Sequence, residues 1–137
     1  MTPDPELIAE THGWIEKAKH DLRMAELALG DSHPLTDQAV FHAQQAAEKA
    51  LKSFLTWHRQ SFRKTHHLEE LGEQCLAIDA TLRTSVDNAV PLTEYAWHYR
   101  YPSVDADPPP AEAEEALSIA RALLAAVLAL LPGETRP

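Results

Sequence analysis

The sequence has few of the residues that build cofactor loops, disulfides or metal sites. Only four of its 137 residues are glycine, and no two glycines lie close together, so a glycine-rich phosphate loop is excluded. Cys75 is the single cysteine, which excludes an intrachain disulfide, and its acidic and apolar neighbours favour a small buried side chain over a nucleophile. No two histidines lie four residues apart with an acidic companion, so we expect neither a metal site nor a cofactor.

Long apolar runs and targeting signals are also missing. The most apolar segment, residues 116–131, contains Ser118 and Arg121 and is shorter than the roughly 20 apolar residues that cross a bilayer. The N-terminal MTPDPELIAETHGW has no basic start and no apolar run, unlike a secretory signal. We therefore expect a cytoplasmic protein without membrane contact.

Positive charge is scarce overall but locally concentrated. Twelve Lys and Arg residues face 21 Asp and Glu residues, a net charge of −9, which argues against nucleic-acid binding over the whole surface. Residues 49–64 contain no acid, yet they hold five of the twelve basic residues: Lys49, Lys52, Arg59, Arg63 and Lys64. One basic surface on an acidic body predicts a local anion site.

Apolar residues recur with a helical period along nearly the whole chain. The pattern predicts helices over about 6–29, 36–58 and 66–78, and a last helix from the proline run to about 131. Between them it predicts a break or bend near residues 79–82, followed by a fourth helix that reaches about residue 99. Thr36 and Thr65 are the expected N-caps of the second and third helices, and Pro91 should kink or divide the fourth. We predict an all-α fold, an up-and-down bundle of four to five helices in a single domain over 1–137.

The expected core comes from stripes at helical spacing. In the second helix the stripe consists of Ala43, Ala46, Ala47, Ala50, Leu51, Phe54 and Leu55, and in the third of Leu68, Leu71, Cys75 and Leu76. The last helix is apolar around most of its circumference, so it is either central in its own fold or covered by a partner. This pattern favours a homodimer.

The polar face of the second helix has two interpretations at this point. Gln45 and Lys49 lie four residues apart, as do Glu48 and Lys52, so these side chains can touch along the helix. They form either a solvated face with helix-stabilising pairs or the lining of a site.

Three segments together resemble a known family. They are FHAQQAAEKALKSFL (41–55), FRKTHHLEEL (62–71) and YRYP (99–102). In this order they resemble the HEPN domain, the helical family named for higher eukaryotes and prokaryotes nucleotide-binding, over about residues 14–131. The resemblance implies a helical bundle, usually dimeric, often paired with a minimal nucleotidyltransferase in a toxin–antitoxin module. It also implies one of two activities: metal-independent RNA cleavage, or nucleotide binding and partner recognition.

The sequence departs from the pattern of the cleaving members. They use an Arg followed four to six residues later by a His, whereas Arg100 is followed over 101–107 by no histidine. Arg stabilises charge on phosphate but does not transfer the proton that RNA cleavage needs near neutral pH. His98 precedes Arg100 and points to a different side of a helix, and the Arg59…His66 spacing falls in a link.

The function therefore has three hypotheses. The first is a nucleotide-binding or nucleotidyltransferase-partner module, with an anion held by Lys49, Lys52, Arg63 and Arg100. In it Tyr101 stacks on a base while Gln44 and Gln45 contact base or ribose. The second is a ribonuclease toxin that uses Arg100 and, more remotely, His66. The third is a structural dimeric adaptor whose apolar last helix is the interaction surface.

Overall fold

The computed structural model describes residues 4–136, and in this range it contains helices and no strand. The α-helices are α1 (Pro5–Gly30), α2 (Thr36–Trp57), α3 (Leu68–Ile78), α4 (Arg83–Ala89) and α5 (Pro110–Ala129). Three 3₁₀ helices, η1 (Ala80–Leu82), η2 (Val90–Ala96) and η3 (Gly133–Thr135), complete it. The predicted all-α bundle is confirmed.

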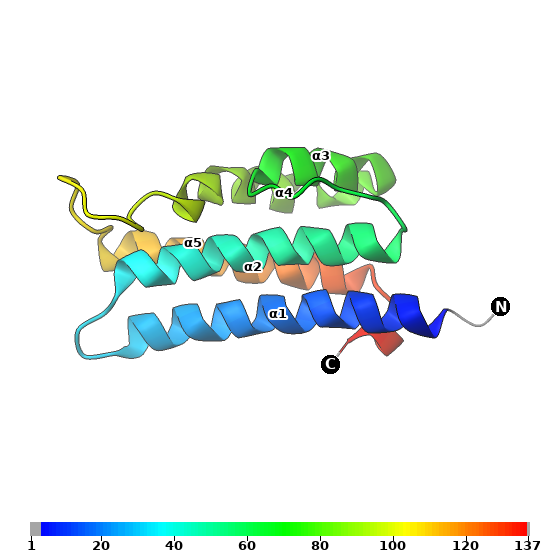
Figure 1. The fold of residues 1–137 in the computed structure, drawn as a ribbon, viewed down its shortest axis with the longest axis horizontal. Coiled ribbons are helices and arrows are strands. Elements are labelled where there is room, and N and C mark those ends of the chain that lie inside the picture. The colour runs from blue at the N-terminus through cyan, green and yellow to red at the C-terminus, as the bar shows by residue number, and fades with distance from the viewer. Residues whose placement is uncertain (1–3, 137) are drawn as a thin grey trace.

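The long helices lie side by side, and α2 is central to their arrangement (Figure 1). It packs against α1 along most of its length, against α5, and against α3 and η2. The link between α2 and α3 returns along α3 toward the middle of the bundle (Figure 1). Consequently, side chains on α2 meet residues of α1, α3, α5 and η2.

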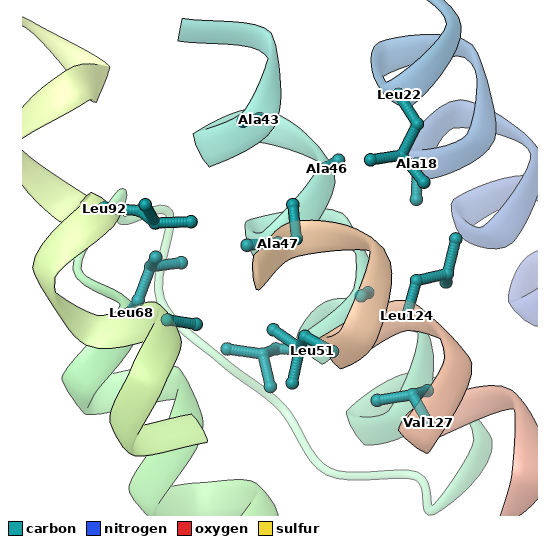
Figure 2. Packing of buried hydrophobic residues seen from close by; sticks show 14 of the residues in the cluster. Ala18, Leu22, Ala43, Ala46, Ala47, Leu51, Leu68, Leu92, Leu124 and Val127 are labelled. Carbon is teal, nitrogen blue, oxygen red and sulfur yellow. The ribbon is translucent and has the colours of Figure 1, made fainter. Parts of the chain in front are cut away.

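Small residues on α2 let its neighbours approach closely. Ala43, Ala46, Ala47 and Ala50 are fully buried, which confirms the predicted stripe. Figure 2 shows some of them between Ala18 and Leu22 of α1, Leu124 and Val127 of α5, and Leu68 and Leu92. The four predicted core residues of the third helix are also buried. Burial of these apolar surfaces holds the bundle together.

Two predicted helix caps are wrong. Thr36 is the first residue of α2 rather than its cap; Leu35 occupies the cap and offers no side-chain acceptor. The third helix begins at Leu68 after His67, so Thr65 lies two residues before its cap. The Thr65 hydroxyl instead accepts the His67 N–H at 3.1 Å, which makes a local turn. A threonine hydroxyl can cap a helix or close a local turn, and the sequence alone did not distinguish these two roles.

The prolines act largely as expected. Pro91 lies at the start of η2, where α4 gives way to a 3₁₀ helix, so it divides the fourth helical segment. α5 begins inside the proline run, with Pro109 at the cap and Pro110 in the first turn. Proline suits the first turn because its missing N–H would have no partner there.

The apolar circumference of α5 is explained mostly within the chain. Leu123, Leu124 and Val127 are at most 4% exposed, because α1, α2 and α4 surround them. Among the large apolar residues of the chain's last segment, Leu130 remains 38% exposed. No helix in residues 4–136 is long and apolar enough to cross a membrane.

Candidate functional site

Glu48 is the centre of the polar face of α2. It is only 4% exposed, and its carboxylate has three donors. Lys52 Nζ lies 2.8 Å from Oε2, while His66 Nδ1 lies 2.7 Å and Gln44 Nε2 3.2 Å from Oε1. The interpretation of Glu48–Lys52 as a solvated surface pair is therefore wrong. A buried carboxylate needs such partners to offset its lost hydration.

Lys52 is buried beneath two aromatic rings. Its side chain is 10% exposed, and its Nζ lies 5.5 Å from the Trp14 ring centroid and 5.7 Å from that of Phe62. The two rings meet edge to face, with centroids 6.1 Å apart. The ammonium thus combines an ion pair with cation–π contacts, and it fixes both rings against the bundle.

The two glutamines of the face are used inside the protein. Gln44 is fully buried, and its amide nitrogen also donates to the backbone carbonyl of His66 at 3.2 Å. Gln45 donates to the Gln44 side-chain oxygen at 2.7 Å and makes no bond to Lys49. Gln44 therefore ties α2 to the link that precedes α3, and Gln45 supports Gln44 from the same helix. Gln44 has little capacity left for a ligand.

Lys49 belongs to a second network, between α1 and α2. Asp21 of α1 accepts from Lys49 Nζ at 2.5 Å and lies 2.8 Å from His42 Nδ1. Sequence reasoning missed Asp21. The pattern that could have indicated it is an acidic residue at the helical spacing of the core, between Ala18 and Ala25 on the buried face of α1.

Arg63 pairs with an acid on the third helix. Its guanidinium contacts both carboxylate oxygens of Glu70, at 2.6–3.2 Å. Hydrogen bonding to Arg63 lowers the pKa of the Glu70 carboxyl below its ordinary value. The pair is exposed and fastens the link to α3. The sequence did not indicate this pair, because Arg63 belongs to the acid-free stretch 49–64 and Glu70 lies beyond it, seven positions after Arg63.

Arg100 lies apart from these networks. Its guanidinium carbon is 4.4 Å from the Phe41 ring centroid, and one nitrogen donates to the Ala96 carbonyl at 3.4 Å. Within residues 4–136 it has no carboxylate partner. Tyr101 beside it is 72% exposed. Both line a hollow of about 310 Å³ that Asp37, Asp105 and Asp107 also line, none of them in an ion pair with Arg100.

His98 does not reach toward Arg100. Its ring stacks on Tyr99 with centroids 3.8 Å apart, and its Nε2 lies 3.3 Å from the Asp105 carboxylate. Tyr99 has a φ of 69°, the left-handed region that is uncommon for a non-glycine residue. This strained corner directly precedes Arg100, and no sequence pattern indicated it.

The candidate residues therefore divide among separate groups. Gln44, Lys52 and His66 contact Glu48, whereas Arg100 lies on the Phe41 ring. Lys49 and Arg63 belong to pairs of their own. Seven residues of helix separate Phe41 from Glu48, or about 10 Å. His67, next to His66, packs edge to face on Trp97, with centroids 5.8 Å apart. In the described part of the chain, no three His, Cys, Asp or Glu side chains gather as metal ligands.

Comparisons with known proteins agree with this architecture. The family model described as HEPN domain matches residues 11–130. Among solved structures, the chain is similar to TT1696 from Thermus thermophilus, with 32% sequence identity and a TM-score of 0.68. That match covers 88% of this chain and 98% of the other. Curated proteins give no match.

Proposed function

The chain belongs to the HEPN domain family, a family of nucleotide-binding or ribonuclease-like helical modules, and from this premise we propose that it is a binding module rather than a nuclease. Its ligand is a nucleotide or single-stranded RNA, and its protein partner is a nucleotidyltransferase of a toxin–antitoxin-like system. The ligand contacts centre on Arg100 and Tyr101.

The observation that carries this proposal is the setting of Arg100. Lys49, Lys52 and Arg63 each hold a carboxylate, so an anion would have to displace an acid to reach them. Arg100 has no such competitor in residues 4–136, and the Phe41 ring holds its guanidinium at an exposed edge. A planar guanidinium suits phosphate, and the exposed Tyr101 ring offers a stacking surface for a base.

The same setting argues against cleavage at Arg100. RNA hydrolysis through the 2′-OH needs a group that transfers a proton beside the phosphate. Residues 101–107 contain no histidine, and His98 is engaged by Asp105. The contacts of the Arg100 side chain are the Phe41 ring and the Ala96 carbonyl, so no histidine in residues 4–136 is bonded to it.

The test compares RNA binding and RNA cleavage in one set of proteins. We expect wild type to bind a fluorescent single-stranded RNA without cleaving total RNA in EDTA. Arg100→Ala should weaken binding about tenfold, as for a lost charge-assisted contact. Arg83→Ala removes another exposed arginine, on α4, and is the control. Equal affinity of Arg100→Ala and wild type would refute the proposal.

A ribonuclease remains the second candidate because of one feature. Glu48 binds Nδ1 of His66 while 56% of the His66 side chain is exposed, so Nε2 is the nitrogen left for a proton transfer. If the protein does cleave RNA in EDTA, His66→Ala should abolish cleavage more completely than His98→Ala. Cleavage lost in Arg100→Ala alone would assign the reaction to Arg100.

We further propose that the protein is a homodimer. The supporting feature is the outer edge of α5, where Ala122, Ala125 and Leu130 are exposed in a single chain. Small residues let two helices approach closely. Leu124 and Val127, in contrast, are core residues, so charged substitutions there would unfold the chain rather than test assembly.

A further inference from the structure

We propose that a second base-binding site lies at the other end of α2, in a hollow that no motif of the sequence indicated. The Trp14 hollow, as we name it, has a volume of about 590 Å³. It is lined by Leu7, Glu10 and Trp14 of α1, Thr56 of α2, and Arg59, Gln60, Ser61 and Phe62 of the link. Its ligand is a planar nucleobase carrying a phosphate, either a free mononucleotide or the 5′ end of an RNA strand.

The aromatic wall of the hollow is held in place before any ligand arrives. Trp14 and Phe62 are half-buried and meet edge to face, and the Lys52 ammonium fixes both rings from the buried side. Lys52 is in turn held by Glu48. A base that stacks on a fixed ring loses little free energy to ordering of the site. The wall is therefore suited to a planar ligand.

Arg59 supplies the positive charge at the rim. Its φ is 56°, so the link leaves α2 through a left-handed residue that is not glycine. Such a conformation costs about 1–3 kcal/mol and persists where surrounding contacts enforce it. Here the Arg59 N–H donates to Thr56 at 3.0 Å and the Gln60 N–H to Leu55 at 2.9 Å.

The guanidinium of Arg59 is free to exchange partners. It is 66% exposed, and its single acidic neighbour among the described residues is Asp4 at 3.6 Å. An exposed pair at that distance contributes little, so a phosphate can replace the carboxylate. Arg59 therefore differs from Lys49 and Lys52, whose carboxylates are buried.

Glu10 gives the hollow a preference among bases. It lies on the wall formed by α1 and has no ion-pair partner within residues 4–136. A carboxylate accepts hydrogen bonds from an exocyclic amino group, which adenine, guanine and cytosine carry and uracil lacks. We therefore expect an amino-bearing base and a weaker response to uridine monophosphate.

The site shares its ligand class with the proposed function but does not involve Arg100. The test uses tryptophan fluorescence in the full chain, with Trp57→Phe and Trp97→Phe combined so that Trp14 is the single emitter. Adenosine monophosphate should quench this emission saturably, and adenosine should bind at least tenfold more weakly. Arg59→Ala should weaken nucleotide binding about tenfold, whereas Arg100→Ala and the matched Arg83→Ala should leave it unchanged.

The two possible ligand sources are distinguished by competing RNA oligonucleotides. Displacement of the mononucleotide by 5′-phosphorylated but not 5′-hydroxyl RNA assigns the site to a strand end, and no displacement by either assigns it to free nucleotide. No saturable quenching, or quenching equal in Arg59→Ala, would overturn the proposal. If Arg100→Ala loses RNA binding while adenosine monophosphate still quenches Trp14, the Arg100 surface and the Trp14 hollow are two independent sites.

Discussion

Among single residues, Glu48 makes the clearest prediction about stability. Glu48→Gln removes the charge that balances Lys52, a side chain only 10% exposed. Breaking a buried pair in this way costs about 3–5 kcal/mol, because the remaining charge is uncompensated. We expect urea denaturation to show a loss of this size in the free energy of unfolding.

Two further variants separate the buried charge from general damage at the site. Lys52→Met added to Glu48→Gln should recover part of the stability, since the uncompensated ammonium is gone. Glu73→Gln breaks an exposed pair with Arg83 and should change stability by at most about 1 kcal/mol. A Glu48→Gln protein as stable as Glu73→Gln would show that the Glu48 pair is not buried in solution.

Cys75 predicts how stability depends on pH. Burial raises the pKa of its thiol from 9.0 to about 12, so the folded protein keeps a proton that the unfolded chain loses. The stability that the protonated Cys75 thiol contributes is therefore fully present below pH 9, and it is lost as the pH rises toward 12. Stability should fall by at most about 1.4 kcal/mol per pH unit across this window.

The contribution of the Cys75 thiol to this pH dependence is measured by comparing wild type and Cys75→Ala at two pH values. Urea unfolding at pH 8 and pH 10.5 should show a steeper loss for wild type than for Cys75→Ala. Cys75→Ala retains the smaller slope due to Tyr95, whose pKa burial also raises. Identical slopes in the two proteins would mean that the thiol is accessible in the folded state.

At the scale of elements, the sequence predicted helices well and their ends less well. Helix positions followed from apolar spacing, which samples many residues at once, and Pro91 and Gly30 marked boundaries through their backbone chemistry. A cap depends on one residue, and α2 begins one residue earlier than expected while the Thr65 hydroxyl accepts from His67 in a local turn. Local competition of this kind is not readable from spacing.

The contact between α3 and α4 depends on a missing side chain. A Cβ added at Gly72 would lie 2.4 Å from Cγ1 of Val86, well inside van der Waals contact. We expect Gly72→Ala to destabilise the protein by about 1–3 kcal/mol through overpacking. Combining Val86→Ala with Gly72→Ala should relieve the clash, so the unfolding temperature of the double variant should exceed that of Gly72→Ala alone.

Gly13 on α1 is the opposite case, because a Cβ added there meets open space. Gly13→Ala should therefore raise the free energy of unfolding by about 0.5–1 kcal/mol.

At the scale of the whole molecule, contacts within one helix were predictable from the sequence, but contacts between helices were not. Glu48 and Lys52 lie one turn apart, so their contact follows from helical geometry. Asp21 and Lys49 lie 28 positions apart on different helices, and only the packing of α1 on α2 joins them. A basic stretch in a sequence therefore does not imply free positive charge in the fold.

Arg100, in contrast, is a basic residue that composition does not single out and that has no acidic partner in residues 4–136. It is the single basic residue between Arg83 and Arg121, in a stretch with seven acids, so composition gives it no prominence. Its guanidinium lies on the Phe41 ring, 59 positions away in the sequence, and is in no ion pair within residues 4–136. Long-range packing thus places this arginine on an aromatic ring, which the sequence did not indicate.

The homodimer is the last prediction, and it concerns the whole molecule. Ala125 is exposed on the outer edge of α5, so a glutamate there should be tolerated by a single chain. In a dimer that joins these edges, the same glutamate would bury a charge without a partner. We expect wild type to scatter light with twice the 15.2 kDa mass of one chain, and Ala125→Glu with that mass alone.

The control for assembly is a glutamate on a different exposed surface. Leu27 is 56% exposed on α1, and Leu27→Glu should remain dimeric if α5 is the interface. Equal unfolding temperatures of the two variants, measured at low concentration, would exclude a folding defect. A monomeric Leu27→Glu with a dimeric Ala125→Glu would move the interface to α1. A monomeric wild type would leave the Arg100 surface and the Trp14 hollow as sites of one chain, since neither draws a residue from a second copy.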